Sequence, residues 1–501
     1  MSPLRFGTAG IRGPLGNGPD DMNVDVVIRT TAGLAAWLRE RCLGGGVVVV
    51  GYDARHGSAE FATAAAEILA GAGFSVTKLP GPLPTPVTAF AVRALDAVAG
   101  VQITASHNPP DDNGYKVYLS GGAQLISPAD REIEQFIERV GAPDLLPRVP
   151  VEPVGDDLTQ RYLERVAALP RGTQRGLRIA LTALHGVGGA TAEAALRGAG
   201  FTDIHVVATQ FEPDPDFPTV PFPNPEEPGA TDALLALADE VDADLAIALD
   251  PDADRCALGV RGSDGWRMLR GDETGPLLGD YVLQGAPPDS LVASTVVSSR
   301  LLAKVAAARG ARHAETLTGF KWLVRAGDGL VYAYEEAIGH CVDPNVVRDK
   351  DGISAAVLAA DLAAGLKAEG SKGGGRGLLD VLDDYAVEFG VHAGDQVSRR
   401  VHDLTEIEAT MTQLRSWPAE TLAGEAATMT DLLDRRGQAR TDALIFDAEH
   451  SRIVIRPSGT EPKLKCYLEV VEPVTGHADL PRARAAAQTR LDELREFCND
   501  L

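Results

Sequence analysis

One short polar segment of this sequence places a serine where it could react. Residues 104–110 read Thr-Ala-Ser-His-Asn-Pro-Pro. The neighbours of Ser106 are small and the two prolines stiffen the loop, so the hydroxyl could act as a nucleophile or as a carrier of phosphate. An ordinary serine–asparagine turn is the alternative interpretation of the same residues.

A second segment is rich in carboxylates. Residues 250–255 read Asp-Pro-Asp-Ala-Asp-Arg, so that Asp250, Asp252 and Asp254 alternate with other residues. One loop can fold three such carboxylates around a hard divalent cation such as Mg²⁺. The spread is shorter than that of a calcium-binding helix–loop–helix loop and lacks its terminal glutamate. A solvated acidic turn is the alternative, but the adjacent Arg255 favours a metal site.

Two further segments form a candidate sugar site. Residues 318–321 read Thr-Gly-Phe-Lys and residues 334–340 read Tyr-Glu-Glu-Ala-Ile-Gly-His. A carboxylate such as that of Glu335 can accept hydrogen bonds from neighbouring sugar hydroxyls. Lys350, within the charged segment 348–352, adds a cation suited to a phosphate.

Residues 456–463 have the composition of a phosphate cradle. They read Arg-Pro-Ser-Gly-Thr-Glu-Pro-Lys. Arg456 offers a planar fork of donors, Ser458 and Thr460 offer hydroxyls, and Gly459 lets backbone N–H groups approach a ligand closely. An ordinary tight hairpin is the alternative.

Three basic or glycine-rich loops are weaker candidates. Residues 5–13 read Arg-Phe-Gly-Thr-Ala-Gly-Ile-Arg-Gly and contain Arg12. Arg55 and Lys116 lie in two other short loops that follow or precede predicted strands. Each of these loops, taken alone, is typical of an ordinary surface loop.

The reactive loops follow predicted strands. Apolar composition predicts strands over 97–104, 244–249 and 329–334, which end next to Ser106, Asp250 and Glu335, respectively. Further strands are expected over 47–51, 74–78 and 177–181, with helices over 59–70, 191–198 and 300–309. Because ligands of such sheets bind beyond the strand ends, this pattern predicts three similar α/β domains with mixed sheets that face one cleft.

The end of the chain predicts a separate α+β domain. It combines strands over 452–456 and 464–471 with a helix over 480–498. Proline- and glycine-rich segments at 141–156 and 285–290 are typical of linkers, and residues 370–377 of a flexible loop. The expected domains are a phosphoserine domain (1–145), a metal-binding domain (157–285), a sugar-binding domain (286–390) and a C-terminal phosphate-binding domain (391–501).

Composition narrows the function classes. The chain has 501 residues, which suits three or four domains, and a formal charge of 47 − 71 = −24. This charge argues against nucleic acid or an anionic membrane as the main partner. No apolar run is long enough for a membrane span, and the first residues lack the apolar core of a signal peptide. Five scattered cysteines without metal-ligand spacing fit a reducing cytoplasm.

Taken together, the loops resemble those of the α-D-phosphohexomutase superfamily, which includes phosphoglucomutase and phosphomannomutase. The matching segments are Phe-Gly-Thr-Ala-Gly-Ile-Arg-Gly, Thr-Ala-Ser-His-Asn-Pro, Asp-Pro-Asp-Ala-Asp-Arg and Arg-Pro-Ser-Gly-Thr-Glu-Pro, in the family's order along nearly the whole chain. The resemblance implies an α/β fold of three similar domains and a C-terminal domain around a central cleft. It also implies phosphoryl transfer between the 1- and 6-positions of glucose or mannose phosphate.

The resemblance further implies roles for individual residues. Ser106 would be phosphorylated, and Mg²⁺ would be held by its phosphate and by Asp250, Asp252 and Asp254. A bisphosphorylated sugar would prime Ser106 and recur as the intermediate. Lys116 and His107 are alternative candidates for the base that takes the proton from the attacking sugar hydroxyl. Arg12 is also expected to be a catalytic residue. Substrate contacts are expected from Arg255, Thr318, Gly319, Glu335, Ala337, Lys350, Arg456, Ser458, Gly459 and Thr460.

The segment at 334–339 departs from the family's usual Gly-Glu-x-Ser-Gly. Tyr334 replaces the glycine, Ala337 replaces the serine, and Ile338 precedes Gly339. This form is similar to the subgroup of phosphopentomutase-like and glucose-bisphosphate-forming members. A phosphopentomutase that acts on 1- and 5-phosphates, or a sugar-bisphosphate synthase, therefore remains an alternative.

A phosphatase and a non-catalytic sugar-phosphate sensor are two further alternatives. A phosphatase could use the same phosphoserine, whereas a plain hydrolase would not need the terminal phosphate loop. A non-catalytic sugar-phosphate sensor would be expected to lack Ser106 or one of the aspartates of residues 250–255, the predicted metal loop. All four of these residues are present. The expected partners are a small-molecule sugar phosphate and no nucleic acid or membrane, with a monomeric or homodimeric enzyme.

Overall fold

The computed structural model describes residues 6–7, 10–370, 375–401, 404–458 and 463–501 of the chain. The chain divides into two compact units. The first unit comprises Met1–Thr274 and Leu330–Arg376, and the second comprises Gly275–Gly329 and Gly377–Leu501.

The first unit begins with a five-stranded mixed sheet of order β1-β5-β4-β2-β3. Strand β2 pairs in parallel with β3 and β4, whereas β5 pairs antiparallel with β4 and β1. The strands are β1 (Ile11–Pro14), β2 (Val47–Tyr52), β3 (Ser75–Pro82), β4 (Ala99–Ile103) and β5 (Asp112–Leu119).

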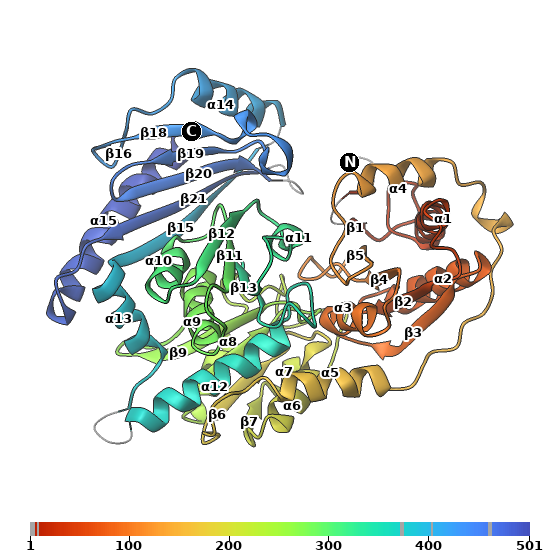
Figure 1. Cartoon of the computed structure of the whole chain (residues 1–501), viewed down its shortest axis with the longest axis horizontal. Helices are drawn as coiled ribbons and strands as arrows, with labels where there is room; N and C mark the ends of the chain where they lie inside the picture. The colour runs from red at the N-terminus through yellow and green to blue at the C-terminus, as the bar shows by residue number, and fades with distance from the viewer. Residues whose placement is uncertain (1–5, 8–9, 371–374, 402–403, 459–462) are drawn as a thin grey trace. The chain divides into compact units, whose positions relative to one another are not determined.

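Helices cover both faces of this sheet (Figure 1). They are α1 (Val24–Glu40), α2 (Ser58–Gly71), α3 (Thr85–Ala94) and α4 (Ala129–Glu138). Successive residues of a strand point to opposite faces. Val48 and Val50 therefore pack in one cluster with α1 and α2, while Gly51 lies against Thr88 of α3, where an added Cβ would approach the hydroxyl to 2.2 Å.

The second sheet has the order β10-β9-β8-β6-β7, and its strands β9-β8-β6-β7 repeat the arrangement of β5-β4-β2-β3. The edge strands differ, because β1 precedes the other strands of its sheet in the chain whereas β10 follows the other strands of its own. Strand β6 pairs in parallel with β7 and β8, and β9 pairs antiparallel with β8 and β10. The strands are β6 (Arg178–Thr182), β7 (Asp203–Val206), β8 (Leu245–Leu249), β9 (Cys256–Gly262) and β10 (Gly265–Met268). The helices of this part are α5 (Asp157–Ala167), α6 (Gly188–Gly198), α7 (Ala208–Phe211) and α8 (Asp232–Glu240).

The remaining part of the first unit contains an antiparallel pair and a buried helix. Strand β13 (Leu330–Glu335) pairs with β14 (Gly339–Cys341), and α12 (Gly352–Gly370) follows. A Cβ on Gly352 would lie 2.3 Å from the carbonyl oxygen of Arg255, so glycine lets α12 begin directly against the chain that follows β8. Helix α9 (Gly271–Leu283) leads into the second unit.

The second unit combines a parallel strand pair with an antiparallel sheet of order β15-β21-β20-β19-β18. Its strands are β11 (Leu291–Thr295), β12 (Arg312–Thr316), β15 (Val391–Arg400), β16 (Thr421–Leu422), β17 (Glu425–Ala426), β18 (Thr428–Asp431), β19 (Leu444–Asp447), β20 (Ser451–Pro457) and β21 (Lys463–Glu472). Its helices are α10 (Leu301–Ala308), α11 (Phe320–Leu323), α13 (Leu378–Phe389), α14 (Leu404–Ser416) and α15 (Leu480–Asn499). Apolar residues of α15 and of β15, β20 and β21 form the core of this sheet.

The expected mixed α/β fold class is confirmed, and the predicted elements differ from the observed ones mainly at their ends. Strand β3 continues to Pro82, beyond the predicted end at residue 78, and Pro82 pairs with Tyr52 after a register shift. Proline is tolerated there because β3 is an edge strand.

The predicted linker at 141–156 is ordered against the first sheet's helices and strands. It contains a 3₁₀ turn at Pro143–Leu145, and the amides of Val149 and Val154 donate to carbonyls of Glu67 and Lys78. Within the described ranges, no helix is both long and apolar enough to cross a membrane.

Candidate active site

Ser106 lies in the loop that connects the antiparallel neighbours β4 and β5, directly after β4. Its backbone adopts a left-handed φ of +55°, and its amide donates to Thr104 Oγ1 at 2.8 Å. Its Oγ donates to Asp250 Oδ2 at 2.9 Å, and Nδ1 of His107 lies 3.2 Å from the same Oγ. The serine hydroxyl is therefore held against a carboxylate on one side and an imidazole on the other.

The guanidinium of Arg55 fixes the shape of this loop. Its two Nη atoms donate to four carbonyl oxygens of the loop, namely those of Ser106, Asn108, Pro109 and Asp112, at 2.5–3.1 Å. Phe217 supports the guanidinium with its ring centroid 4.9 Å away. Arg55 is itself buried, so this positive charge replaces water as the partner of the loop carbonyls.

The three aspartates of the metal loop gather after β8. Asp250, Asp252 and Asp254 are all buried, and one carboxylate oxygen of each lies within 4.8 Å of the others. Within the described part of the chain, Oδ1 of Asp252 and Oδ1 of Asp254 are buried and have no hydrogen-bond partner. Buried carboxylate oxygens without donors are costly, and a divalent cation would satisfy them. The residues therefore fit a magnesium ion.

Two lysines lie beside these carboxylates. Lys116 Nζ donates to Asp252 Oδ2 at 2.6 Å and to Asp254 Oδ2 at 2.9 Å, and Lys350 Nζ lies 3.3 Å from Asp254 Oδ2. Burial would lower the pKa of Lys116, but the two aspartates raise it above its usual value. The pKa of Lys350 is raised by Asp254 in the same way, against the effect of burial. Both lysines are therefore held as cations.

The aspartates and the histidine are shifted in different directions. Burial raises the pKa of Asp250 well above its usual value, and Asp252 and Asp254 add to the effect. Burial acts in the same sense on Asp252, but Lys116 outweighs it and lowers that pKa. Burial and the charge of Arg255 hold the pKa of His107 well below its usual value, so its imidazole is neutral.

Arg255 connects the metal loop with the segment after β13. Its backbone amide donates to Asp250 Oδ1 at 3.0 Å, and its Nη1 donates to the carbonyl of Ala337 at 3.2 Å. Its Nη2 lies 3.8 Å from Glu335 Oε1. Burial raises the pKa of Glu335, although Lys350 acts against this shift. The structure thus brings Glu335, Ala337 and Lys350 together with the aspartates.

Arg12 also reaches this site. It lies on β1, which pairs with β5, and its Nη1 donates to Asn108 Oδ1 at 2.9 Å. The first unit therefore brings together Ser106, His107, Lys116, Arg12, Arg255, Glu335, Ala337, Lys350 and the three aspartates.

The other predicted residues lie in the second unit or outside the described residues. Thr318 and Gly319 precede α11, and Gly319 has a φ of +105°. Arg456 lies at the end of β20, and the amide of Ser458 donates to the carbonyl of Lys463 at 2.8 Å across the hairpin. Gly459 and Thr460 lie outside the described residues.

Sequence reasoning missed two contributions to the site. Thr85, the first residue of α3, donates its hydroxyl to Asp252 Oδ2 at 2.6 Å. Asp349 accepts hydrogen bonds from the hydroxyl of Tyr118 and the amide of Lys350, both at 2.9 Å. For Thr85, the sequence offered only a threonine between two prolines, which does not indicate a hydrogen-bond partner far along the chain.

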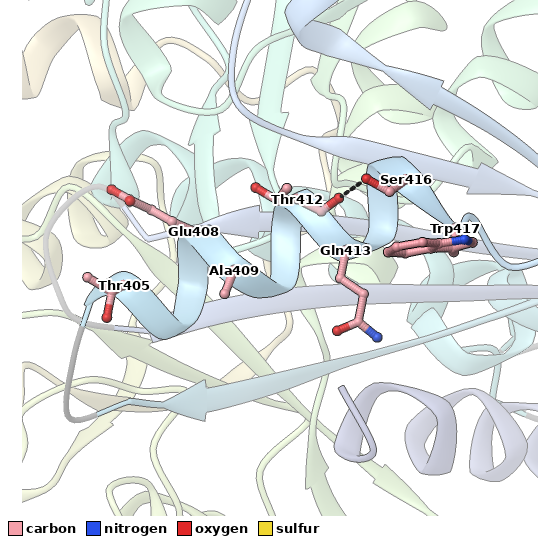
Figure 2. Close-up of a pocket in the computed structure, with 7 residues that line it drawn as sticks. All are labelled: Thr405, Glu408, Ala409, Thr412, Gln413, Ser416 and Trp417. Atoms are coloured by element: carbon pink, nitrogen blue, oxygen red, sulfur yellow. Dashed lines mark hydrogen bonds between the residues drawn. The ribbon is translucent and has the colours of Figure 1, made fainter.

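A shallow hollow on the surface of α14 differs in composition from the candidate active site. It is lined by Thr405, Glu408, Ala409, Thr412, Gln413, Ser416 and Trp417, as Figure 2 shows. Ser416 Oγ donates to the carbonyl of Thr412 at 2.9 Å, and Trp417 is 78% exposed. Glu408 is the only ionisable side chain among these seven, and none of them belongs to the predicted site.

Family models match four successive stretches of the chain. They are the models of phosphoglucomutase/phosphomannomutase α/β/α domains I, II and III, at residues 3–143, 160–263 and 270–376, and of the C-terminal domain, at residues 418–478.

Individual proteins are similar over almost the full length. A Haemophilus influenzae protein named a probable phosphomannomutase is 43% identical over 89% of this chain and 93% of its own. The phosphopentomutase of Mus musculus is 34% identical over 95% of this chain and 85% of its own. The crystal structure of a Thermus thermophilus protein, assigned provisionally as a phosphomannomutase, has a TM-score of 0.76 at 25% identity and covers 98% of this chain and 99% of its own.

Proposed function

Because this chain belongs to the phosphoglucomutase/phosphomannomutase family, we propose that it moves a phosphoryl group between the 1- and 6-positions of a hexose phosphate and uses Ser106 as the carrier. It is accordingly an isomerase of the phosphosugar mutase type. The observation that carries the proposal is the hydrogen bond of 2.9 Å between Ser106 Oγ and Asp250 Oδ2, because it joins the serine loop to the three clustered aspartates.

Each half-reaction transfers one phosphoryl group. In the first, the bond between Ser106 Oγ and phosphorus breaks, a bond between phosphorus and a sugar oxygen forms, and the proton of that sugar hydroxyl passes to a base. In the second, the other phosphoryl group of the bisphosphorylated sugar passes to Ser106 Oγ, and the sugar oxygen that it leaves takes the proton back from the base. His107 is favoured as this base because its lowered pKa leaves the imidazole neutral beside Oγ. Lys116 has a raised pKa and is favoured as a fixed cation that stabilises charge on the transferred group.

Asp250, Asp252 and Asp254 would hold a magnesium ion together with the phosphate on Ser106. The ion would draw charge from the phosphoryl oxygens and make the serine oxygen a better leaving group. Oδ1 of Asp252 and Oδ1 of Asp254, which have no hydrogen-bond partner among the described residues, support this assignment.

Sugar and phosphate contacts are assigned by chemistry. Glu335 would accept hydrogen bonds from sugar hydroxyls, with Arg255, Ala337 and Lys350 beside it. The remaining sugar and distal phosphate contacts would come from Thr318, Gly319, Arg456, Ser458, Gly459 and Thr460. A bisphosphorylated sugar would phosphorylate Ser106. It would also be the intermediate, which must reverse its orientation in the site between the two half-reactions.

A phosphopentomutase is the second candidate. It is favoured by the mouse relative and by the alanine at position 337, which removes a hydroxyl from the expected sugar loop. The same reaction would then join the 1- and 5-positions of a pentose phosphate.

The domain division at 1–145, 157–285, 286–390 and 391–501 is part of the proposal. The assignment to the cytoplasm and the monomeric or homodimeric state belong to it as well.

A coupled assay with glucose, mannose and ribose 1-phosphates tests the function. With Mg²⁺ and a trace of the matching bisphosphate, we expect isomerisation of a hexose phosphate without net release of inorganic phosphate. Ser106→Ala should lower the rate at least ~10³-fold, as expected for loss of a covalent nucleophile. Ser263→Ala, in an exposed turn, is the matched control.

The outcomes separate the alternatives. Release of phosphate would indicate a phosphatase, and net accumulation of bisphosphate would indicate a synthase. A preference for ribose phosphate would select the phosphopentomutase. A Ser106→Ala variant with a near-normal rate would remove Ser106 from the mechanism.

A further inference from the structure

Thr85 contacts the metal loop through both its side chain and its backbone. Its Oγ1 donates to Asp252 Oδ2 at 2.6 Å, and its amide donates to the carbonyl of Asp252 at 2.9 Å. Thr85 is completely buried, and the two residues are 167 positions apart in the sequence. The beginning of α3 is therefore joined to the metal loop at a single aspartate.

The first sheet fixes the position of Thr85 through Leu83, which lies two residues earlier in the chain. The amide of Leu83 donates to the carbonyl of Tyr52 on β2 at 2.8 Å, and the side chain of Gln102 on β4 donates to the carbonyl of Leu83 at 3.2 Å. Because β4 also ends in the loop of Ser106, the same strand positions both the phosphate carrier and the hydroxyl that contacts Asp252.

The hydrogen bonds of Asp252 are distributed unequally between its two oxygens. Oδ2 accepts from Thr85 Oγ1 and from Lys116 Nζ, both at 2.6 Å. Oδ1 is buried and, among the residues that the structure describes, receives no hydrogen bond. Two donors on one oxygen fix the rotation of the carboxylate and leave the other oxygen for a cation.

We propose that Thr85 is a positioning residue that orients the carboxylate of Asp252 for binding of the divalent cation. The proposal rests on the magnesium site of the proposed function. Residues that hold metal ligands through hydrogen bonds commonly change metal affinity 10–100-fold when they are replaced. Thr85 acts from the first sheet on a ligand that follows the second sheet, so it couples the geometry of the two.

The test is direct titration of the purified enzyme with Mn²⁺, followed by electron paramagnetic resonance of the free ion. Thr85→Val keeps the shape of the side chain and removes the hydroxyl, and Thr85→Ser restores it. Thr31→Val is the matched control, because Thr31 is equally buried and its hydroxyl bonds the carbonyl of Val27 and the hydroxyl of Tyr115, not the metal loop.

We expect Thr85→Val to weaken Mn²⁺ binding about 10-fold or more and to raise the Mg²⁺ concentration for half-maximal activity by a similar factor. Thr85→Ser and Thr31→Val should bind Mn²⁺ within about twofold of the parent enzyme. If valine prevents folding, Thr85→Ala removes the same hydroxyl and carries the same expectation. A purely structural role would lower the melting temperature and leave the affinity of the folded enzyme unchanged.

One result would disprove the role of Thr85, and another would disprove the metal site itself. If the parent enzyme binds Mn²⁺ and Asp252→Asn weakens it, but folded Thr85→Val binds as the parent does, the role of Thr85 is wrong. If the parent enzyme does not bind Mn²⁺, or if Asp252→Asn leaves binding unchanged, the metal site of the proposed function is wrong.

Discussion

Replacement of Arg55 by lysine tests how the serine loop is held. The guanidinium donates to four loop carbonyls, including that of Ser106, and lies over the ring of Phe217. Lysine keeps the positive charge but has no planar fork. It can therefore satisfy fewer of these carbonyls at the same time.

The magnitude follows from the strain of Ser106 and the bonds that oppose it. A left-handed conformation of a non-glycine residue costs about 1–3 kcal/mol. Hydrogen bonds to a charged group contribute about 1.5–3 kcal/mol each, so four of them exceed this strain several-fold. If lysine loses about half of them, the loop is no longer held firmly, and we expect kcat to fall about 10–100-fold, or about 1.4–2.8 kcal/mol in the barrier.

The assay measures phosphorylation of Ser106, the proposed phosphate carrier. Ser106 phosphorylation by a sugar bisphosphate is measured by mass spectrometry in a rapid-quench series, together with kcat and KM for the sugar phosphate. Arg55→Lys should slow phosphorylation and lower kcat more than it changes KM, because in the proposed function this loop carries the reacting oxygen of Ser106. Arg93→Lys is the control, since Arg93 also donates to two backbone carbonyls, those of Gly121 and Asn345, outside the serine loop.

Wild-type phosphorylation rates in a folded Arg55→Lys enzyme would refute this reasoning. So would an equal loss in Arg93→Lys, because the effect would then be general destabilisation. In either case the left-handed backbone of Ser106 would have to be maintained by its own local bonds, such as that to Thr104.

Two further predictions concern stability. Burial raises the pKa of Asp351, which accepts a hydrogen bond from Tyr162, to about 6, so its ionisation costs stability as pH rises from about 4 to 6. Asp351→Asn should therefore be more stable than the parent at pH 7.5, by up to about 3 kcal/mol, and equally stable near pH 4 in denaturant titrations; a constant difference across this range would contradict it. Burial raises the pKa of Glu469, but bonds from His392 and Arg300 outweigh it and lower that pKa, so its contribution is present near pH 7 and lost in acid. Glu469→Gln should cost about 3 kcal/mol at pH 7 and less at pH 4 by the same titrations, and an equal cost at both pH values would refute the charge pairing.

The reactive loops could be predicted because their signals are local. A buried strand shows as a short apolar run, and the residues at its end show as an abrupt change to polar types. The alternation of Asp250, Asp252 and Asp254 is visible in the sequence without knowledge of the fold. All three aspartates follow one strand, β8, so they lie at the same end of the second sheet.

The contacts of Thr85 and Arg55 could not be predicted in this way. Thr85 begins α3, which packs on the first sheet, whereas Asp252 follows β8 of the second sheet, so their contact depends on how α3 lies against the metal loop. Arg55 is visible as a cation in a loop, but its four bonds depend on the turn that the Ser106 loop makes. Sequence spacing is informative within one element, whereas these bonds join elements that only the folded chain brings together.

The charge of the site explains how an acidic chain can handle phosphate. The chain carries a formal charge of −24, and the metal loop adds three buried carboxylates to the proposed site for an anionic sugar phosphate. Lys116 and Lys350 lie within 3.3 Å of these carboxylates and have raised pKa values, so they remain charged. Arg255 adds a third cation between the carboxylates and Glu335. These three cations lie directly beside the aspartates, and Arg12 and Arg55 add two more at the serine loop. Local positive charge therefore opposes the acidic charge of the chain at Ser106.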